Sequence, residues 1–125
     1  MSYMDGFVVP VPTRNKEAYR EMAAKSAPIF IEYGATRVVE SWGDDIKPGK
    51  VNDFNTAVIA KDGEESVVFS WIEWPSKEVR DAAWEKLMKD ERMKPSGDMP
   101  FSGERLIYGG FSTILDQAAL EQAAA

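Results

Sequence analysis

The residues best suited to chemistry in this sequence are three carboxylates, Asp5, Glu40 and Glu73, each inside a run of strand-forming residues. If the three strands turn these positions to one face, the carboxylates converge on one apolar interior. Carboxylates clustered at low dielectric raise one another's pKa and can act as acid and base. We therefore take them as candidate catalytic residues. In the competing structural interpretation, the same groups pair with basic residues such as Arg37 or Arg105 and only fix a dimer.

Large apolar side chains are expected on the same face as the carboxylates, where they would form the walls of a site for a planar small molecule. The competing interpretation is that these rings only pack a core or an interface. Strand parity, with no bulge shifting the register, gives the assignment. The candidate ligand-binding residues are Phe7, Val38, Trp42, Phe69 and Trp71. The positions expected to face helices instead are Gly6, Val8, Val39, Ser41, Val68, Ser70, Ile72 and Trp74.

The composition excludes several kinds of chemistry. The sequence contains no Cys and no His, which removes thiolate nucleophiles, the commonest general base, the commonest metal ligand and the usual haem ligand. We expect no cofactor and no metal. The formal charge of −6 argues against nucleic acid and against an anionic membrane surface as partners. Without a long apolar run or a leader-like start, the protein is predicted to be cytoplasmic.

The central element is the stretch 67–74, which is β-branched or aromatic at almost every position and is stopped by Pro75. Helical spacing of apolar residues predicts a helix at 13–33, kinked or broken near Pro28 and followed by Gly34 as its C′ residue. A second helix is predicted at 76–90, capped by Ser76. Residues 54–60 suit a short helical turn or an extended segment. Further strands are predicted at 3–11, 35–43 and 104–111.

This order, βαββαβ, predicts an α+β protein with the ferredoxin-like fold, in which a four-stranded antiparallel sheet carries both helices on one face. The other face would be apolar and aromatic, and soluble proteins rarely leave so large a patch exposed. We therefore expect a homodimer with two sheets face to face, a dimeric α/β barrel. Residues 1–115 would form this single domain, and residues 116–125 a flexible or frayed helical tail.

Several blocks of the chain resemble the YbaA-like family of bacterial proteins, a domain-of-unknown-function family. They are residues 3–12, 67–76, 79–81, 99–101 and 105–111, and the similarity runs from Tyr3 to about Leu115. The resemblance implies the dimeric α/β-barrel superfamily and no established activity. Relatives by fold include cofactor-free monooxygenases, haem-degrading enzymes and small stress-response proteins, each with a pocket inside the barrel. Haem degradation is not expected here because the chain has no His.

These observations leave three functional hypotheses. The first is a homodimer that binds a small molecule, such as an aromatic compound, in the barrel interior. The second is an enzyme, resembling a cofactor-free monooxygenase or an isomerase, that uses Asp5, Glu40 or Glu73 as acid or base on an aromatic small molecule. The third is a structural or interaction dimer whose interior is filled by its own side chains.

Overall fold

The computed structural model describes residues 2–95 and 97–120, and its elements follow the predicted βαββαβ order with one short helix added. Short 3₁₀ turns at Thr13–Asn15, Glu91–Met93 and Gly103–Arg105 join some of them. The strands are β1 (Tyr3–Pro12), β2 (Arg37–Trp42), β3 (Glu65–Trp74) and β4 (Ile107–Ser112), and the helices are α1 (Lys16–Glu32), α2 (Phe54–Ala57) and α3 (Lys77–Leu87).

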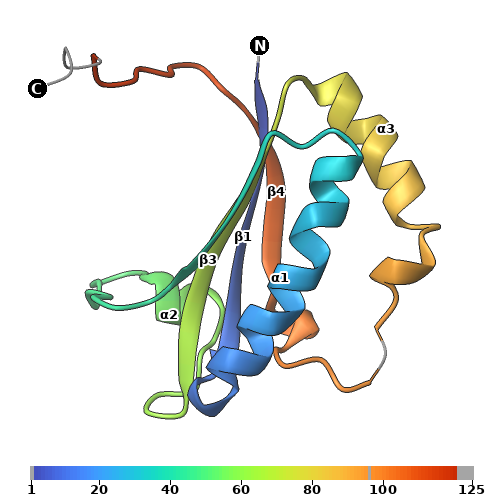
Figure 1. Ribbon diagram of the computed structural model, residues 1–125. Helices are drawn as coiled ribbons and strands as arrows, with labels where there is room; N and C mark the ends of the chain where they lie inside the picture. Colours follow the sequence, from blue (N-terminus) through green and yellow to red (C-terminus); the bar gives the residue numbers. More distant parts are fainter. Residues whose placement is uncertain (1, 96, 121–125) are drawn as a thin grey trace, which may run out of the picture.

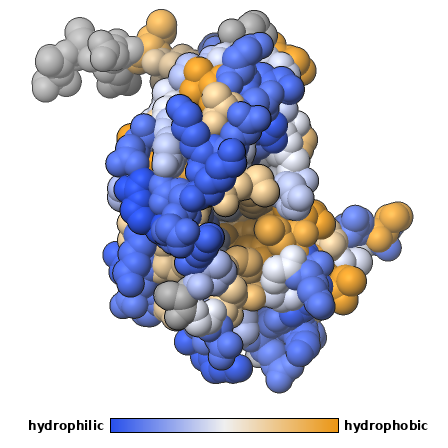
Figure 2. All heavy atoms as spheres, turned by 90° about the vertical axis from the view of Figure 1, so that its right-hand side faces the viewer, coloured by the Kyte–Doolittle hydropathy of each residue, from blue (hydrophilic) through white to orange (hydrophobic). Residues whose placement is uncertain are grey.

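The strands form one antiparallel sheet in the order β2-β3-β1-β4. The helices α1 and α3 cover one face of the sheet, and the short helix α2 lies on the opposite side (Figure 1). The predicted ferredoxin-like α+β fold is therefore confirmed. Seen from the helical side, the surface is mostly hydrophilic, with hydrophobic side chains gathered in one hollow (Figure 2).

The ends of the two long helices follow local rules that the sequence already indicated. The Ser76 hydroxyl accepts a hydrogen bond from the Val79 N–H at 3.2 Å and caps α3 as predicted. Gly34 follows α1 with a φ of +115°, and a Cβ there would lie only 2.8 Å from Val79, so glycine is required on two grounds. The expected break at Pro28 is wrong, because α1 continues through it to Glu32.

The strand register corrects the predicted assignment of the two faces. Directly opposed residues share a face, and Asp5 opposes Ile72 while Glu40 opposes Ser70. Since Ile72 and Ser70 are buried beneath the helices, β1 and β2 turn the opposite parity inward from the one predicted. Only the β3 assignment is confirmed. The helix-facing positions include Asp5, Phe7, Val9, Val38, Glu40, Trp42, Val68, Ser70, Ile72 and Trp74, whereas Gly6, Val8, Val39, Ser41, Phe69, Trp71 and Glu73 lie on the open face.

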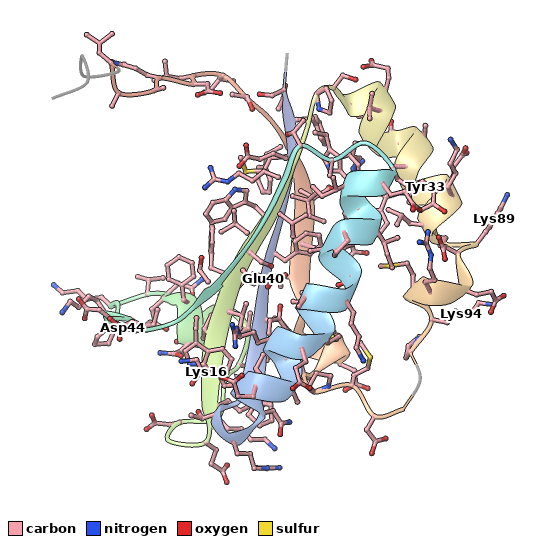
Figure 3. The ribbon with its side chains drawn as sticks, in the orientation of Figure 1. Lys16, Tyr33, Glu40, Asp44, Lys89 and Lys94 are labelled. Atoms are coloured by element: carbon pink, nitrogen blue, oxygen red, sulfur yellow. The ribbon has the colours of Figure 1, made fainter. Side chains whose placement is uncertain are left out.

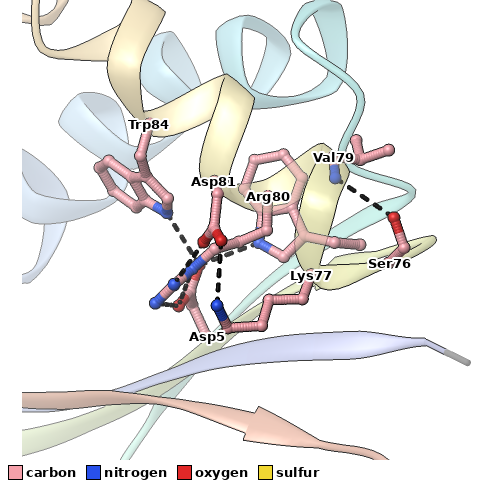
Figure 4. Close-up of polar contacts among 8 residues, drawn as sticks. Asp5, Ser76, Lys77, Val79, Arg80, Asp81 and Trp84 are labelled. Atoms are coloured by element: carbon pink, nitrogen blue, oxygen red, sulfur yellow. Dashed lines mark hydrogen bonds and ion pairs between the residues drawn. The ribbon is translucent and has the colours of Figure 1, made fainter.

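Asp5 explains why β1 turns this way, because its carboxylate is bonded to donors from the helical layer and from β3. The residue is 4% exposed. Its oxygens accept hydrogen bonds from the indole N–H groups of Trp74 and Trp84, both at 2.9 Å. The Arg80 guanidinium of α3 adds bonds of 2.8 and 3.0 Å, and Figure 4 shows Arg80 and Trp84 converging on Asp5. A buried carboxylate is tolerated when its charge is paired and its lone pairs are used in this way.

The neighbouring strand leaves room for this ion pair. Gly110 on β4 opposes Asp5, and a Cβ at Gly110 would overlap the Tyr3 ring and approach the Arg80 guanidinium at 2.9 Å. That guanidinium carbon lies 5.1 Å from the centroid of the Tyr3 ring, within cation–π range. Gly110 is therefore a position of close approach, and the β4 ladder pairs with β1 without a bulge.

The open face is partly covered by the chain itself. The segment after β2 crosses it, and α2 packs Phe54 edge-on against Phe69 with ring centroids 5.9 Å apart. Val67 belongs to the open face by register yet is only 3% exposed. Phe69 remains 43% exposed and Phe111 60% exposed, so this face is covered only in part.

Residues 113–120, which follow β4, form no helix or strand. The rest of the predicted tail at 116–125 lies outside the described residues. No helix within residues 2–95 and 97–120 has both the length and the apolar character needed to span a bilayer.

We expect Asp5→Asn to destabilise the fold by about 3–5 kcal/mol, because it leaves Arg80 and two indole donors around a neutral amide. Denaturant unfolding of the two proteins measures this difference. The matched control is Asp81→Asn, which removes an exposed partner of the same Arg80 and should change the free energy of unfolding little. Equal stability losses in the two variants would contradict a central role for Asp5.

Candidate functional site

A cleft lies between α1 and the edge strand β2, with a volume of about 350 Å³. Small side chains on α1 keep the helix from filling this space, and β2 and β3 supply its floor. The lining residues are Lys16, Tyr19, Arg20, Ala23, Ala24, Ala27, Val38, Glu40, Ser41, Trp42 and Val68. Apolar walls with a few polar groups are the usual composition of a small-molecule site.

The polar centre of the cleft is a pair formed by Tyr19 and Glu40. The Tyr19 hydroxyl donates a hydrogen bond of 2.6 Å to Oε1 of Glu40. Tyr19 is buried, 7% exposed, and its ring packs edge-on against Phe101 at a centroid distance of 6.0 Å. This packing fixes the direction of the hydroxyl, so the Glu40 carboxylate is held at a defined place beside the cleft.

The surroundings shift the titration of both groups. Burial among protein atoms raises the pKa of Glu40, although hydrogen bonds from Tyr19 and Ser70 oppose the shift. Glu40 nevertheless remains accessible through the open side of the cleft. Burial, followed by the neighbouring Glu40 charge, raises the pKa of Tyr19 far above its usual range. Tyr19 is therefore a permanent hydrogen-bond donor, while Glu40 can exchange a proton nearer neutral pH than an ordinary glutamate.

Positive charge lies at the end of the cleft formed by the first turns of α1. Lys16 is the first residue of α1, and its Nζ lies 5.5 Å from the centroid of the Trp42 ring. Arg20, one turn further on, is mostly exposed and pairs with Glu17 at 3.3 Å. Figure 3 shows Lys16 near the start of the helix and Glu40 closer to the middle of the sheet.

The structure distributes the predicted site residues over three places. Glu40, Val38 and Trp42 line the cleft. Asp5 is fully engaged by Trp74, Trp84 and Arg80, and Phe7 packs on the adjoining core. Glu73, Phe69 and Trp71 lie on the open face, where Glu73 accepts a 2.9 Å hydrogen bond from Trp71 and pairs with Arg37 at 3.9 Å. The predicted convergence of the three carboxylates is therefore wrong, because Glu73 lies on the other side of the sheet.

Sequence reasoning missed Tyr19 and Lys16 as site residues. Tyr19 was recognisable on the apolar side of the first helix, but nothing in the spacing showed that its hydroxyl would meet Glu40. The contact between Tyr19 and Glu40 could have been suspected because Glu40 shares a strand face with the apolar residues Val38 and Trp42. A carboxylate among apolar side chains needs a hydrogen-bond donor.

A second hollow, of about 410 Å³, lies on the open face. Trp71 on β3 is followed across the sheet by two glycines in the same row, Gly6 on β1 and then Gly109 on β4. Phe111 folds over Gly6, since a Cβ on that glycine would approach its ring at 3.3 Å. This hollow is almost entirely apolar and offers no paired acid and donor. Among the described residues, no three acidic side chains gather closely enough to hold a metal ion.

The fold of the protein is shared with solved structures of other proteins. A structure of an MhuD variant with two manganese protoporphyrin IX molecules bound per active site matches with a TM-score of 0.62 and 17% identity, over 94% of this chain and 99% of that chain. A Bacillus cereus protein assigned by name to the antibiotic biosynthesis monooxygenases matches with a TM-score of 0.55 and 14% identity, over 94% and 98%. At these identities the similarity shows the ferredoxin-like fold alone.

The chain belongs to the DUF1428 family, described as proteins of unknown function, whose model matches residues 2–103. The uncharacterized protein YbaA of Escherichia coli strain K12 is 63% identical over 118 residues, which are 94% of this chain and all of that protein. YbaA of Shigella flexneri shows the same identity and coverage. The resemblance to YbaA-like proteins is thus confirmed.

The raised pKa of Glu40 predicts a pH-dependent stability difference. Between the ordinary pKa of glutamate and the raised value, the folded protein binds more protons than the unfolded chain. The contribution of Glu40 to stability is therefore highest in acid and falls as the pH rises through that window. Glu40→Gln removes this dependence, so its stability relative to the parent protein should increase from about pH 4 towards neutrality.

Denaturant unfolding at a series of pH values measures this difference. Glu21→Gln, on the exposed surface of α1, controls for the loss of one negative charge. A relative stability of Glu40→Gln that stays flat or falls with rising pH would show that the carboxyl is not held as described.

Proposed function

We propose that the protein binds a small aromatic molecule in the cleft between α1 and β2. The observation that carries the proposal is the Tyr19–Glu40 pair, a 2.6 Å hydrogen bond placed within otherwise apolar walls. A buried hydroxyl that is bonded to an exposed carboxylate beside an open cleft is the kind of polar group that orients a ligand within apolar walls. The proposed site replaces a barrel interior as the place where the ligand binds.

The solved structures of similar fold support small-molecule binding as a property of the class without identifying the molecule. The MhuD variant carries manganese protoporphyrin IX. This chain contains no histidine to hold an iron or manganese atom through imidazole. A volume of about 350 Å³ is near the lower end for small-molecule sites, about 300–1,000 Å³, and suits one or two rings.

A second candidate function is proton transfer within the same cleft. Glu40, whose pKa is raised by burial, could accept the hydroxyl proton of a phenolic ligand, and Tyr19 would stabilise the carboxylate before the transfer. The deprotonated ring is electron-rich, which is the requirement for cofactor-free reaction with dioxygen. This activity would need the binding site proposed above, so binding is the first property to test.

We further propose that the protein forms a homodimer through the open face. Phe69, Trp71, Ile107 and Phe111 present large apolar groups on this side, and patches of this kind in soluble proteins mark interaction sites. Two copies related by a twofold axis would bring these surfaces together and enclose the second hollow. The carboxylate Glu73, already paired with Arg37, would lie at the rim.

We expect Ala27→Phe to block the cleft and abolish binding of aromatic fragments. Ala27 lines the cleft on α1, and a phenyl group there would occupy the space without removing Tyr19 or Glu40. Ligand-observed NMR with a library of one- and two-ring compounds measures binding. The control is Ala18→Phe, on an exposed position of the same helix outside the cleft. Fragments that bind Ala27→Phe as well as the parent protein would place the site elsewhere, and a parent protein that binds none would refute the proposal.

Trp71→Ala should weaken the dimer on the order of a hundredfold, because a central aromatic residue of an interface contributes about 2–3 kcal/mol. Analytical ultracentrifugation over a dilution series gives the dissociation constant. Met88→Ala, which removes a large apolar side chain that is 80% exposed on the helical side, serves as the control. A monomeric parent protein, or a Trp71→Ala dimer as stable as that of the parent, would overturn the proposed dimer interface on the open face.

A further inference from the structure

The charges around the cleft are separated along its length. Lys16 and Arg20 contribute cations from the first turns of α1, whereas Glu40 contributes the acid that is bonded to Tyr19. Among residues 2–95 and 97–120, Lys16 has no ion-pair partner, and its Nζ lies over the Trp42 ring instead. The pair between Arg20 and Glu17 is exposed on both sides and would exchange readily for another anion. An incoming negative charge therefore finds two cations available at this end.

The overall charge of the protein is opposite in sign to the charge of Lys16 and Arg20 at the cleft. The chain carries a formal charge of −6, so an anion is repelled at long range. Lys16 and Arg20 nevertheless form a positive region at the end of the cleft near the start of α1, where no acidic side chain is among the lining residues. Lys16 is also the first residue of a helix of 17 residues, and the positive end of that helix dipole adds to the attraction.

The walls of the cleft favour an apolar body. Three alanines of α1 form one wall, and Val38, Trp42 and Val68 from β2 and β3 form the other. An indole plane and small aliphatic groups suit an aromatic ring better than a sugar or a peptide. Glu40 at the other polar position accepts hydrogen bonds and has no proton to donate when ionised. A ligand hydroxyl would complement it.

We propose that the cleft recognises aromatic carboxylic acids of one or two rings that carry a hydroxyl group distant from the carboxylate. The carboxylate binds Lys16 and Arg20, the ring lies against Trp42, and the hydroxyl donates to Glu40. This assignment rests on the proposed function of the cleft and adds the class of ligand. It also sets the direction in which the ligand lies, with its anionic end towards the start of α1.

The test compares three matched probes by NMR titration of the isotopically labelled protein, in which the Trp42 indole signal reports the cleft. The probes are para-hydroxybenzoate, para-hydroxybenzyl alcohol, which lacks the charge, and benzoate, which lacks the hydroxyl. We expect the hydroxy acid to bind at least about tenfold more tightly than the alcohol, because a charge-assisted contact to Lys16 is lost in the alcohol. It should also bind more tightly than benzoate.

Two variants assign these preferences to residues. Lys16→Met should bring the affinity for para-hydroxybenzoate close to that for the alcohol, whereas Lys25→Met, an exposed lysine of α1 outside the cleft, should keep the preference. Glu40→Gln should reduce the advantage of the hydroxy acid over benzoate, since an amide oxygen is a weaker acceptor than a carboxylate.

The outcomes separate this inference from the proposed function. Equal binding of the acid and the alcohol, both shifting the Trp42 signal, would overturn the ligand class and leave the cleft as a binding site. A preference for the acid that survives in Lys16→Met would also overturn it. Absence of binding by all three probes, together with no fragment binding to the parent protein, would refute both.

Discussion

The buried carboxylate of Asp5 is the constraint on which the arrangement of the sheet depends. A charge at this depth is tolerated only when donors surround it, and here they come from α3 and from the end of β3. Once Asp5 points towards the helical layer, the alternation of β1 is fixed from one end to the other. Met4, Gly6 and Val8 must then face the other side. The same bonds hold α3 against the sheet, so the orientation of one strand and the docking of one helix have a common cause.

The cleft exists because the other helix packs differently. α1 meets the edge strand β2 through alanines, and short side chains leave a gap where leucines would have filled it. Polar side chains are tolerated at this position because they form a hydrogen bond with each other. Tyr19 donates to Glu40, and the ring of Tyr19 is buried against Phe101. The result is an acid that is packed against protein atoms on one side and exposed to solvent on the other. An edge strand covered by a helix on one side is well placed for such a site, since neither layer closes it completely.

Much of the fold could be predicted from the sequence, because the relevant signals are local. The continuous apolar run before Pro75, the cap at Ser76 and the glycine at position 34 each specify one boundary, and the structure confirms them. The two faces could not be predicted for β1 and β2. By strand parity, Asp5 was expected on the face opposite the helices. Its true orientation depends on partners about 70 residues later in the chain, which no pattern within the strand reveals.

The same limit applies to the candidate site. Val38, Glu40 and Trp42 were selected because they share a strand parity, and they do lie together in the cleft. Glu73 was grouped with them on an assumed register, and the ladder places it on the opposite side. Tyr19 belongs to a helix whose rotation relative to the sheet is set by packing, so its hydroxyl contact with Glu40 is a property of the assembled layers. Cofactor use and cellular location stay predictions.

Because the sheet is a single layer, the cleft and the open face lie on opposite sides of the same strands. Neighbouring residues of β2 point alternately to one and to the other, so Glu40 in the cleft is separated from Val39 on the open face by one peptide unit. Side chains of β2 on the two sides are separated by the layer, so influence between them passes mainly through the backbone of a hydrogen-bonded ladder, which deforms little. Recognition and self-association would then be thermodynamically almost uncoupled, and substitutions could adjust one while leaving the other intact.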